Sequence, residues 1–337
     1  MPVLAQREAA RWHGSADWVT FVLGLDRESE RVGTMATPQR SILTALGEHQ
    51  WYVHLSRTEG ADLGIIKEAL ANVRTDCDRQ GVNLSIMFGP TLLAELTDDI
   101  PDDFQPYPGY HSADGKEAKG TQEELLIWVH SDHKDRNWST QYGFRTAVAG
   151  HMAVARETIA WIYGASLDLT GFIDGTGNPE SDRQYESAVV PDGSPGAGGS
   201  FAIAQRWVHD LKYFFGLSPD DQENLFGRTK ANSIRLDKQV PTSHLSHVEL
   251  RQGETADASK PKRGEIVRRS TPYALHDGTV GLYFLGFCKE QAPLRERMEA
   301  MYGLNGQVRD ALTDYSTPAS GSYYFAPSNE VLDAALG

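Results

Sequence analysis

The stretch Leu169-Thr170-Gly171-Phe172-Ile173-Asp174-Gly175-Thr176-Gly177-Asn178-Pro179 stands where one series of predicted strands and helices ends and a second begins. Glycines, two Asx residues and a proline crowd together in it, which predicts a tightly folded loop without regular structure. The stretch alone is equally compatible with a plain turn in which Asp174 caps its own backbone. A calcium loop of the EF-hand type is excluded, because Pro179 and Tyr185 occupy positions that require glycine and glutamate.

The chain before this loop follows the order strand, helix, strand, strand, helix, strand. One helix is predicted from apolar residues at helical spacing, with Gly81 ending the pattern. The strands are predicted from β-rich or alternating segments. The predicted strands are 18–25, 82–88, 124–129 and 157–163, and the predicted helices are 62–79 and 138–152.

The chain after the loop repeats this alternation. Residues 189–200 predict an irregular loop, and Ser218 followed by Pro219 predicts a helix start. The other predicted elements are strands at 201–211, 247–251, 265–270, 279–288 and 322–326 and a helix at 293–302. The sequence thus predicts an α+β fold of two tandem ferredoxin-like domains, residues 1–165 and 166–337, each an antiparallel β-sheet with helices packed on one face.

The composition excludes several classes of partner. The 337 residues carry a net charge of −14, whereas nucleic acids and anionic membranes attract basic surfaces. Cys77 and Cys288 lie far apart in the sequence, which favours two reduced, packed thiols over a disulfide scaffold. Residues 1–14 have no apolar core of a signal peptide. We therefore expect a cytoplasmic protein that binds neither nucleic acid nor membrane.

Two histidines stand three positions apart in Pro241–His247. On a helix, His244 and His247 would share a face and could bind a metal ion, whereas on a strand they would point to opposite faces. Surface or satisfied core histidines are the ordinary interpretation of such a pair. No glutamate stands in an HExxH arrangement, so a zinc protease is not supported.

A third segment, Gly264–Tyr273, is predicted to contain a strand that carries adjacent arginines. A period of two puts Ile266, Arg268 and Ser270 on one face and Arg269 on the other. An arginine that shares a face with isoleucine could point into a pocket. A solvated arginine on an edge strand is the ordinary alternative.

Together these segments resemble dye-decolourising peroxidases, a haem family with two ferredoxin-like domains. The family's GxxDG motif is matched by Gly171–Gly175. The resemblance is to the bacterial cytoplasmic branch (P/B type) and covers residues 17–330. It rests further on GRTKANSI (227–234), TSHLSHVEL (242–250), EIVRRSTPY (265–273), GLYFLGFC (281–288) and SYYFAP (322–327), which occur in the family's order.

The resemblance assigns roles to residues of the three segments. His244 matches the proximal ligand of the haem iron, and His247 is the alternative. Asp174 matches the distal aspartate and Arg268 the distal arginine, with Arg269 as the fallback because the loop before Arg268 looks longer than in relatives.

Further residues are implied around the haem. Ser270 would be a third distal polar group. Leu282 and Phe284 alternate on one face of their strand and would form an apolar wall over the haem. Thr176 and Asn178 are weaker candidates for contact with a propionate.

The resemblance implies one haem b per subunit and a peroxidase that reduces hydrogen peroxide and oxidises dyes, phenolics or other organic donors through a high-valent iron-oxo intermediate. Asp174, ionised beside a cation, would relay a proton. Arg268 would stabilise the charge that develops on the leaving oxygen. Bulky dyes would be oxidised through tryptophans or tyrosines at the surface.

Two other functions remain open. A haem-handling protein that releases iron from porphyrin would share the fold and the ligand. A haem-free ferredoxin-like interaction protein would have structural histidines. Relatives commonly assemble, so the resemblance also implies a homo-oligomer, a dimer or larger.

Overall fold

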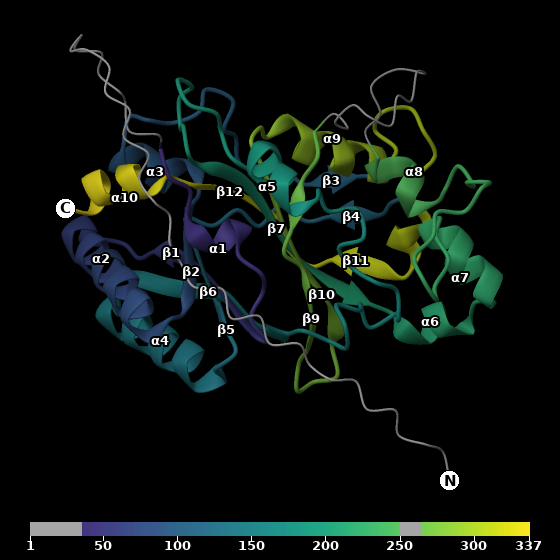
Figure 1. The fold of residues 1–337 in the computed structure, drawn as a ribbon, viewed down its shortest axis with the longest axis horizontal. Helices are drawn as coiled ribbons and strands as arrows, with labels where there is room; N and C mark the ends of the chain where they lie inside the picture. The colour runs from purple at the N-terminus through teal and green to yellow at the C-terminus, as the bar shows by residue number, and fades with distance from the viewer. Residues whose placement is uncertain (1–35, 250–263) are drawn as a thin grey trace, which may run out of the picture. The chain divides into compact units, whose positions relative to one another are not determined.

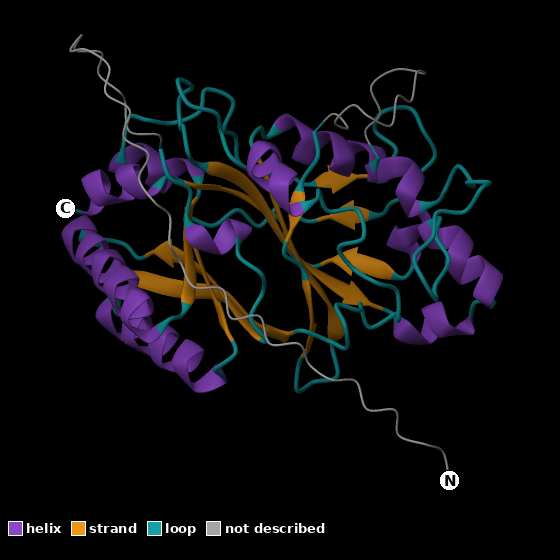
Figure 2. Ribbon diagram, in the orientation of Figure 1, coloured by secondary structure: helices purple, strands orange, loops and turns teal. Residues whose placement is uncertain are grey.

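Two runs of four antiparallel strands carry the structure, and each has the strand order of a ferredoxin-like unit (Figure 1, Figure 2). The computed structural model describes residues 36–249 and 264–337, so the predicted strand at 18–25 lies outside the described residues. The first run has the order β2-β5-β1-β6 and the second β9-β10-β7-β12. The strands are β1 (His49–Arg57), β2 (Asn83–Phe88), β5 (Leu125–Ser131), β6 (Met152–Trp161), β7 (Ser200–His209), β9 (Thr271–Ala274), β10 (Val280–Cys288) and β12 (Ser322–Ala326).

Helices cover the outer side of each run. In the first half, α2 (Leu63–Gln80) and α4 (Lys134–Ala147) pack against each other and against the strands. In the second half, α9 (Ala292–Met301) packs on β10, and α8 (His244–Val248) packs on α9. The other elements are α1 (Arg40–Leu43), α3 (Pro90–Leu96), β3 (Tyr110–His111), β4 (Glu117–Ala118), α5 (Ser181–Ala188), α6 (Leu211–Gly216), α7 (Pro219–Phe226), β8 (Val267–Arg268), η1 (Ala311–Asp314), β11 (Ser316–Pro318) and α10 (Asn329–Leu336).

Strand pairing joins the two runs. Phe325 of β12 pairs with Phe88 of β2, and Ala160 of β6 pairs with Tyr273 of β9. Because β10 also pairs with β7, the strands of the two runs close into a ring. The described residues all fall within one compact unit, so the proposed boundary between domains 1–165 and 166–337 stays a prediction.

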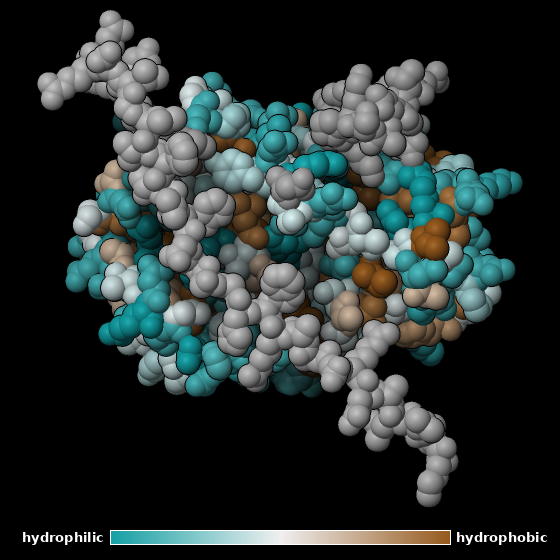
Figure 3. Space-filling view, viewed as in Figure 1, coloured by the Kyte–Doolittle hydropathy of each residue, from teal (hydrophilic) through white to brown (hydrophobic). Residues whose placement is uncertain are grey.

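The period of two along the strands divides the core between two regions. On β1, Trp51 and Val53 face the cluster that lies under the helices, whereas Tyr52 faces a second cluster between the two runs of strands. Tyr283 on β10 faces the second cluster as well. Figure 3 shows that hydrophilic residues predominate on the visible surface, in keeping with the net charge of −14.

Local signals explain where the helices begin and end. The Asp62 carboxylate accepts hydrogen bonds from the first turn of α2, and Gly81 ends that helix with φ +67°. Ser218 caps α7 as predicted, with its hydroxyl accepting a hydrogen bond from the backbone N–H of Asp221 at 3.2 Å. Within the described residues, no helix is both long and apolar enough to span a bilayer.

Two sequence-based expectations are corrected. The first strand of the described ring, β1, was not predicted. The predicted strand at 247–251 is wrong for residues 247 and 248, because His244–Val248 is the helix α8. On this helix Leu245 is buried and Val248 packs against the cluster under the helices. Tertiary packing of that apolar face outweighs the strand propensity of so short a segment.

Gly281 on β10 provides a test of the ring closure. A Cβ at this position would overlap the carbonyl oxygen of Trp207 on β7. We expect Gly281→Ala to lower the free energy of unfolding by about 1–3 kcal/mol, the usual cost of overpacking. Gly216→Ala is the control, because its Cβ would meet open space at the end of a helix. Urea denaturation measures the free energy of unfolding of both variants, and equal stability would contradict close packing of β7 against β10.

Candidate functional site

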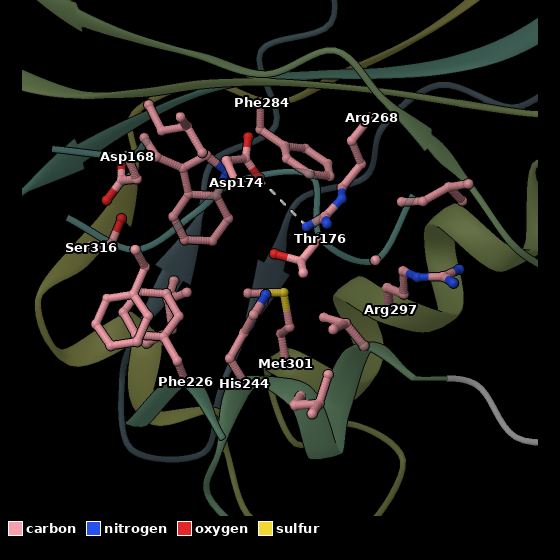
Figure 4. Close-up of a pocket in the computed structure, with 18 of the residues that line it drawn as sticks. Asp168, Asp174, Thr176, Phe226, His244, Arg268, Phe284, Arg297, Met301 and Ser316 are labelled. Atoms are coloured by element: carbon pink, nitrogen blue, oxygen red, sulfur yellow. Dashed lines mark ion pairs between the residues drawn. The ribbon is translucent and has the colours of Figure 1, made fainter. Parts of the chain in front are cut away.

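A cavity lies between the outer face of the second run of strands and the helices α8 and α9 (Figure 4). Most of its wall is apolar. The strands β7 and β10 form one side, and the two helices form the other. The apolar lining includes Ile203, Trp207, Phe226, Leu245, Leu282, Phe284, Leu294, Met298, Met301 and Leu312. Leu282 and Phe284 therefore share a wall of the cavity, as their alternation predicted.

His244 enters the cavity from α8, at the bottom of Figure 4. Its Nδ1 lies 2.7 Å from Oδ2 of Asp310, a residue whose side chain is fully buried. The other carboxylate oxygen of Asp310 accepts the backbone N–H of Leu312 at 2.8 Å. A neutral imidazole that donates Nδ1–H to this carboxylate keeps the lone pair on Nε2. Among the described residues, Nε2 makes no hydrogen bond.

His247 lies on the same helix but is enclosed by backbone. Its Nδ1 is 2.8 Å from the carbonyl oxygen of Ser243, and its Nε2 is 2.6 Å from that of Val308. The side chain is buried and does not line the cavity. Both ring nitrogens are thus engaged, so the geometry favours His244 as the ligating histidine.

Asp174 faces the cavity from the opposite wall, on the loop that the sequence singled out. The loop is held by a bridge between Leu167 and Ile173 and by the Asp174 N–H, which donates to the carbonyl oxygen of Ser166 at 2.9 Å. Its glycine Gly175 has φ +80° and donates its N–H to the Asp174 carboxylate at 2.7 Å. The tight turn thereby aims the carboxylate inward.

Arg268, at the end of β8, pairs with Asp174. The guanidinium Nη1 lies 3.6 Å from Oδ1 of the carboxylate, as the dashed line in Figure 4 marks. Burial raises the pKa of Asp174 above its ordinary value of 3.8, and the Arg268 cation offsets only part of that effect. Desolvation is therefore the larger influence on this carboxylate, and the nearby cation the smaller one.

Asn178 orients this arginine. Its side-chain N–H donates to the Arg268 carbonyl oxygen at 3.0 Å, and its side-chain oxygen accepts the Arg268 N–H at 2.9 Å. One amide N–H and the amide oxygen are engaged by this pair of bonds, and Asn178 lines the second cavity, which Ser270 also borders, and not the main one. Asn178 is thus a positioning residue for Arg268, and its contact with a propionate stays a prediction.

Of the three other predicted residues, one lines the main cavity and two lie away from it. Thr176 lines the cavity, but its hydroxyl is taken by the carbonyl oxygen of Ile173 and the hydroxyl of Ser233. Ser270 lines a second cavity, which Asp174 and Arg268 also border, and its buried hydroxyl has no partner among the described residues. Arg269 is buried and donates to the Ile42 carbonyl oxygen and to Gln184, away from the main cavity.

Sequence reasoning missed the cations Arg228 and Arg297, which also line the cavity. Burial lowers the pKa of Arg297 to about 10 and lowers that of Arg228 as well. Arg228 donates a hydrogen bond to the backbone carbonyl of Ser233, and Arg297 donates one to that of Pro293. Asp310 was also missed, because its closeness to His244 arises only on folding.

One more polar group stands at the far end of the cavity. His209 lies between Ser316 Oγ, 2.7 Å from Nδ1, and Asp168 Oδ1, 3.2 Å from Nε2. Asp168 also accepts hydrogen bonds from Thr170. This group ties the loop of Asp174 to β7 and β11, which supports the placement of the carboxylate.

The fold and the cavity define an α+β protein with ferredoxin-like strand order that presents the Nε2 of His244 to a mostly apolar chamber. A family model described as Dyp-type peroxidase, C-terminal, matches residues 165–331. The chain belongs to the dye-decolourising peroxidase family.

Individual relatives agree with this assignment. A dye-decolorizing peroxidase of Mycolicibacterium paratuberculosis is 29% identical over 219 residues, which is 64% of this chain and 61% of the relative. The solved structure of a dye-decolorizing protein from V. cholerae has a TM-score of 0.78 at 29% identity and covers 87% of this chain and 97% of that one. A deferrochelatase of Escherichia coli is 28% identical over 50% of this chain and 46% of the relative. The chain spans less than two thirds of the length of these curated relatives.

The raised pKa of Asp174 predicts how stability depends on pH. Above pH 3.8 the folded state keeps a proton that the unfolded state has lost, so the free energy of unfolding falls as pH rises through the folded pKa. We expect Asp174→Asn to gain stability over wild type from acidic to neutral pH. The gain should be about 1.4 kcal/mol for each pH unit between 3.8 and the pKa of the folded state.

The matched control is Asp277→Asn, measured by urea denaturation without added ligand. Its carboxylate accepts the Thr279 N–H, which lowers its pKa, so the sign is opposite. That variant should lose stability relative to wild type as pH rises. The same trend in both variants would show that Asp174 is not held in a desolvated site.

Proposed function

We propose that this protein binds one b-type haem per subunit through His244 and uses hydrogen peroxide to oxidise organic donors. The observation that carries the proposal is the pairing of His244 with Asp310, which leaves Nε2 directed into an apolar cavity opposite Asp174 and Arg268. A histidine ligand on one side and an acid with a cation on the other suit a metal that binds peroxide between them.

The donor set fits a porphyrin. Among the described residues, no cluster of three or more His, Cys, Asp or Glu side chains could hold a metal ion. A lone histidine ligates a metal firmly only when the metal brings its other ligands, as haem iron does. The apolar walls suit the porphyrin face, and Arg228 and Arg297 offer cations for its two carboxylates.

The relatives support the same cofactor and activity. The curated matches at 29% identity are named dye-decolorizing peroxidase. A variant of DypB from Rhodococcus jostii RHA1, solved in complex with heme, shares the fold with a TM-score of 0.79 at 24% identity.

The haem supplies the redox chemistry, and the chain's residues prepare peroxide for it. Asp310 holds the His244 ring in one orientation and one tautomer, with Nε2 toward the cavity. Asp174 takes a proton from one peroxide oxygen and returns it to the departing one. Arg268 stabilises the negative charge that develops on the departing oxygen. Asn178 keeps the backbone of Arg268 in register with Asp174.

Replacing His244 tests the cofactor and its ligand together. We expect His244→Ala to lose or alter the Soret band of haem-supplemented protein, because no other described histidine presents a free nitrogen beside Asp310. The control is His276→Ala, which removes an exposed histidine from a turn. An unchanged spectrum in His244→Ala would move the ligand to His247. Protein without a Soret band even after haem addition would favour the haem-free interaction protein.

Arg268 and Asp174 should differ in their pH dependence. We expect Arg268→Leu to slow the reaction with peroxide by about 10²–10³-fold at every pH, because it removes electrostatic stabilisation of the transition state. Asp174→Asn should remove the rise in rate with pH that follows ionisation of Asp174, whose raised pKa puts that rise above 3.8. Stopped-flow absorbance across pH measures both, with Arg268→Lys as the conservative control. Equal pH profiles in wild type and Asp174→Asn would contradict the role of Asp174 as the base.

A second candidate function is favoured by the deferrochelatase relatives. A haem-handling protein would bind haem at the same histidine, oxidise every donor slowly and release iron-free porphyrin. Porphyrin fluorescence after incubation with haem separates the two functions. We further propose, from the family resemblance, a cytoplasmic homo-oligomer.

A further inference from the structure

A histidine lies between two tyrosines in the region between the two runs of strands. Nδ1 of His54 is 2.7 Å from the hydroxyl of Tyr324, and Nε2 is 2.8 Å from the hydroxyl of Tyr283. The two tyrosines are 0% exposed and the histidine 2%. This Tyr–His–Tyr cluster joins β1, β10 and β12 and lines neither described cavity.

His54 can act as a base, because only one of its two ring nitrogens carries a hydrogen when the ring is neutral. Burial, helped by the nearby cations Arg156 and Arg206, lowers its pKa well below 6.5. A neutral imidazole has one N–H and one lone pair. One tyrosine therefore donates its O–H to His54, and the N–H of His54 donates to the other tyrosine.

The cluster continues into stacked aromatic rings. Tyr283 stacks on Tyr52 with ring centres 3.6 Å apart and planes 14° apart. Tyr52 in turn lies nearly parallel to Trp128, with centres 6.1 Å apart. Close ring contact lets an unpaired electron be shared or passed on.

The strand β10 sets the position of the Tyr–His–Tyr cluster relative to the main cavity. Leu282 and Phe284 line that cavity, while Tyr283 between them points to the opposite side of the strand. One strand therefore separates the tyrosine from the chamber that the proposed function assigns to haem.

We propose that Tyr283, His54 and Tyr324 form a tyrosyl radical site that stores one of the oxidising equivalents delivered by peroxide. The inference rests on the proposed function, which supplies the oxidant. The tyrosine that donates to His54 gives one electron to the haem that peroxide has oxidised, and its phenolic proton moves to the histidine. The products are a neutral tyrosyl radical, an imidazolium and a haem reduced by one electron. An organic donor later returns the electron, and His54 returns the proton.

The proton acceptor distinguishes these tyrosines from the others in the core. Burial raises the pKa of Tyr283 well above 10, so the phenolate is not formed beforehand. Oxidation of such a phenol requires a hydrogen-bonded base. The hydroxyl of Tyr110, a residue that is also buried, meets the hydroxyl of Tyr323 at 2.9 Å instead, and a phenol is a poor proton acceptor.

Freeze-quenched electron paramagnetic resonance of the haem-loaded full chain tests the inference. One equivalent of hydrogen peroxide is added, and absorbance is read on the same sample. We expect a tyrosyl signal that narrows when tyrosine is ring-deuterated. His54→Gln should lose this signal, because an amide preserves both hydrogen bonds but is not a base. At least one of the near-isosteric variants Tyr283→Phe and Tyr324→Phe should lose it as well.

Tyr110→Phe is the matched control and should keep the signal. A wild-type sample whose absorbance responds to peroxide without a tyrosyl signal would overturn this inference and leave the proposed function standing. A full signal in His54→Gln, or an equal loss in Tyr110→Phe, would also overturn it. Absence of any response to peroxide would overturn the proposed function itself, and with it the radical site.

Discussion

The pairing of β10 with β7 is the constraint on which the rest of the structure depends. Antiparallel pairing fixes which side chains of each strand share a face, and a slip of one residue would exchange the two sets. In the observed register, Leu282 and Phe284 face the main cavity while Tyr283 faces the interior. Gly281 enforces this register, because only a residue without Cβ fits against Trp207. One strand therefore builds the wall of the proposed haem site and part of the radical site behind it.

Desolvation is the second influence that recurs, and its effect depends on the partner. Asp310 is fully buried but is bonded to His244 and to a backbone N–H, which suits a carboxylate that fixes a tautomer. Asp174 has a cation at 3.6 Å and one backbone N–H, and burial still raises its pKa. The first arrangement fixes the orientation of the His244 ring, and the second leaves Asp174 able to take up and release a proton. These are the properties that a ligand partner and a proton relay require.

The loop of Asp174 shows how a short motif can serve both geometry and chemistry. Gly171 and Gly175 have φ of +85° and +80°, which side chains rarely tolerate. They let the chain turn so that Asp174 faces the cavity. Asn178, four residues after Asp174, binds the backbone of Arg268 on a strand far along the sequence. The motif thereby places both members of the Asp174–Arg268 ion pair, one by its own turn and one through the side chain of Asn178.

The sequence by itself determined the class of fold, most strands, the loop around Asp174 and the family. It could do so because periodicity, turn residues and caps are local properties of the chain. Only the tertiary structure decided that Asp310 meets His244 across 66 positions, that His247 is enclosed by backbone, and that His54 stands between two tyrosines. These contacts join distant segments through packing, and nothing in the local pattern of either segment specifies the other. Residue type thus suggested the chemistry of the site. Packing and burial set the orientation of its side chains and their electrostatics.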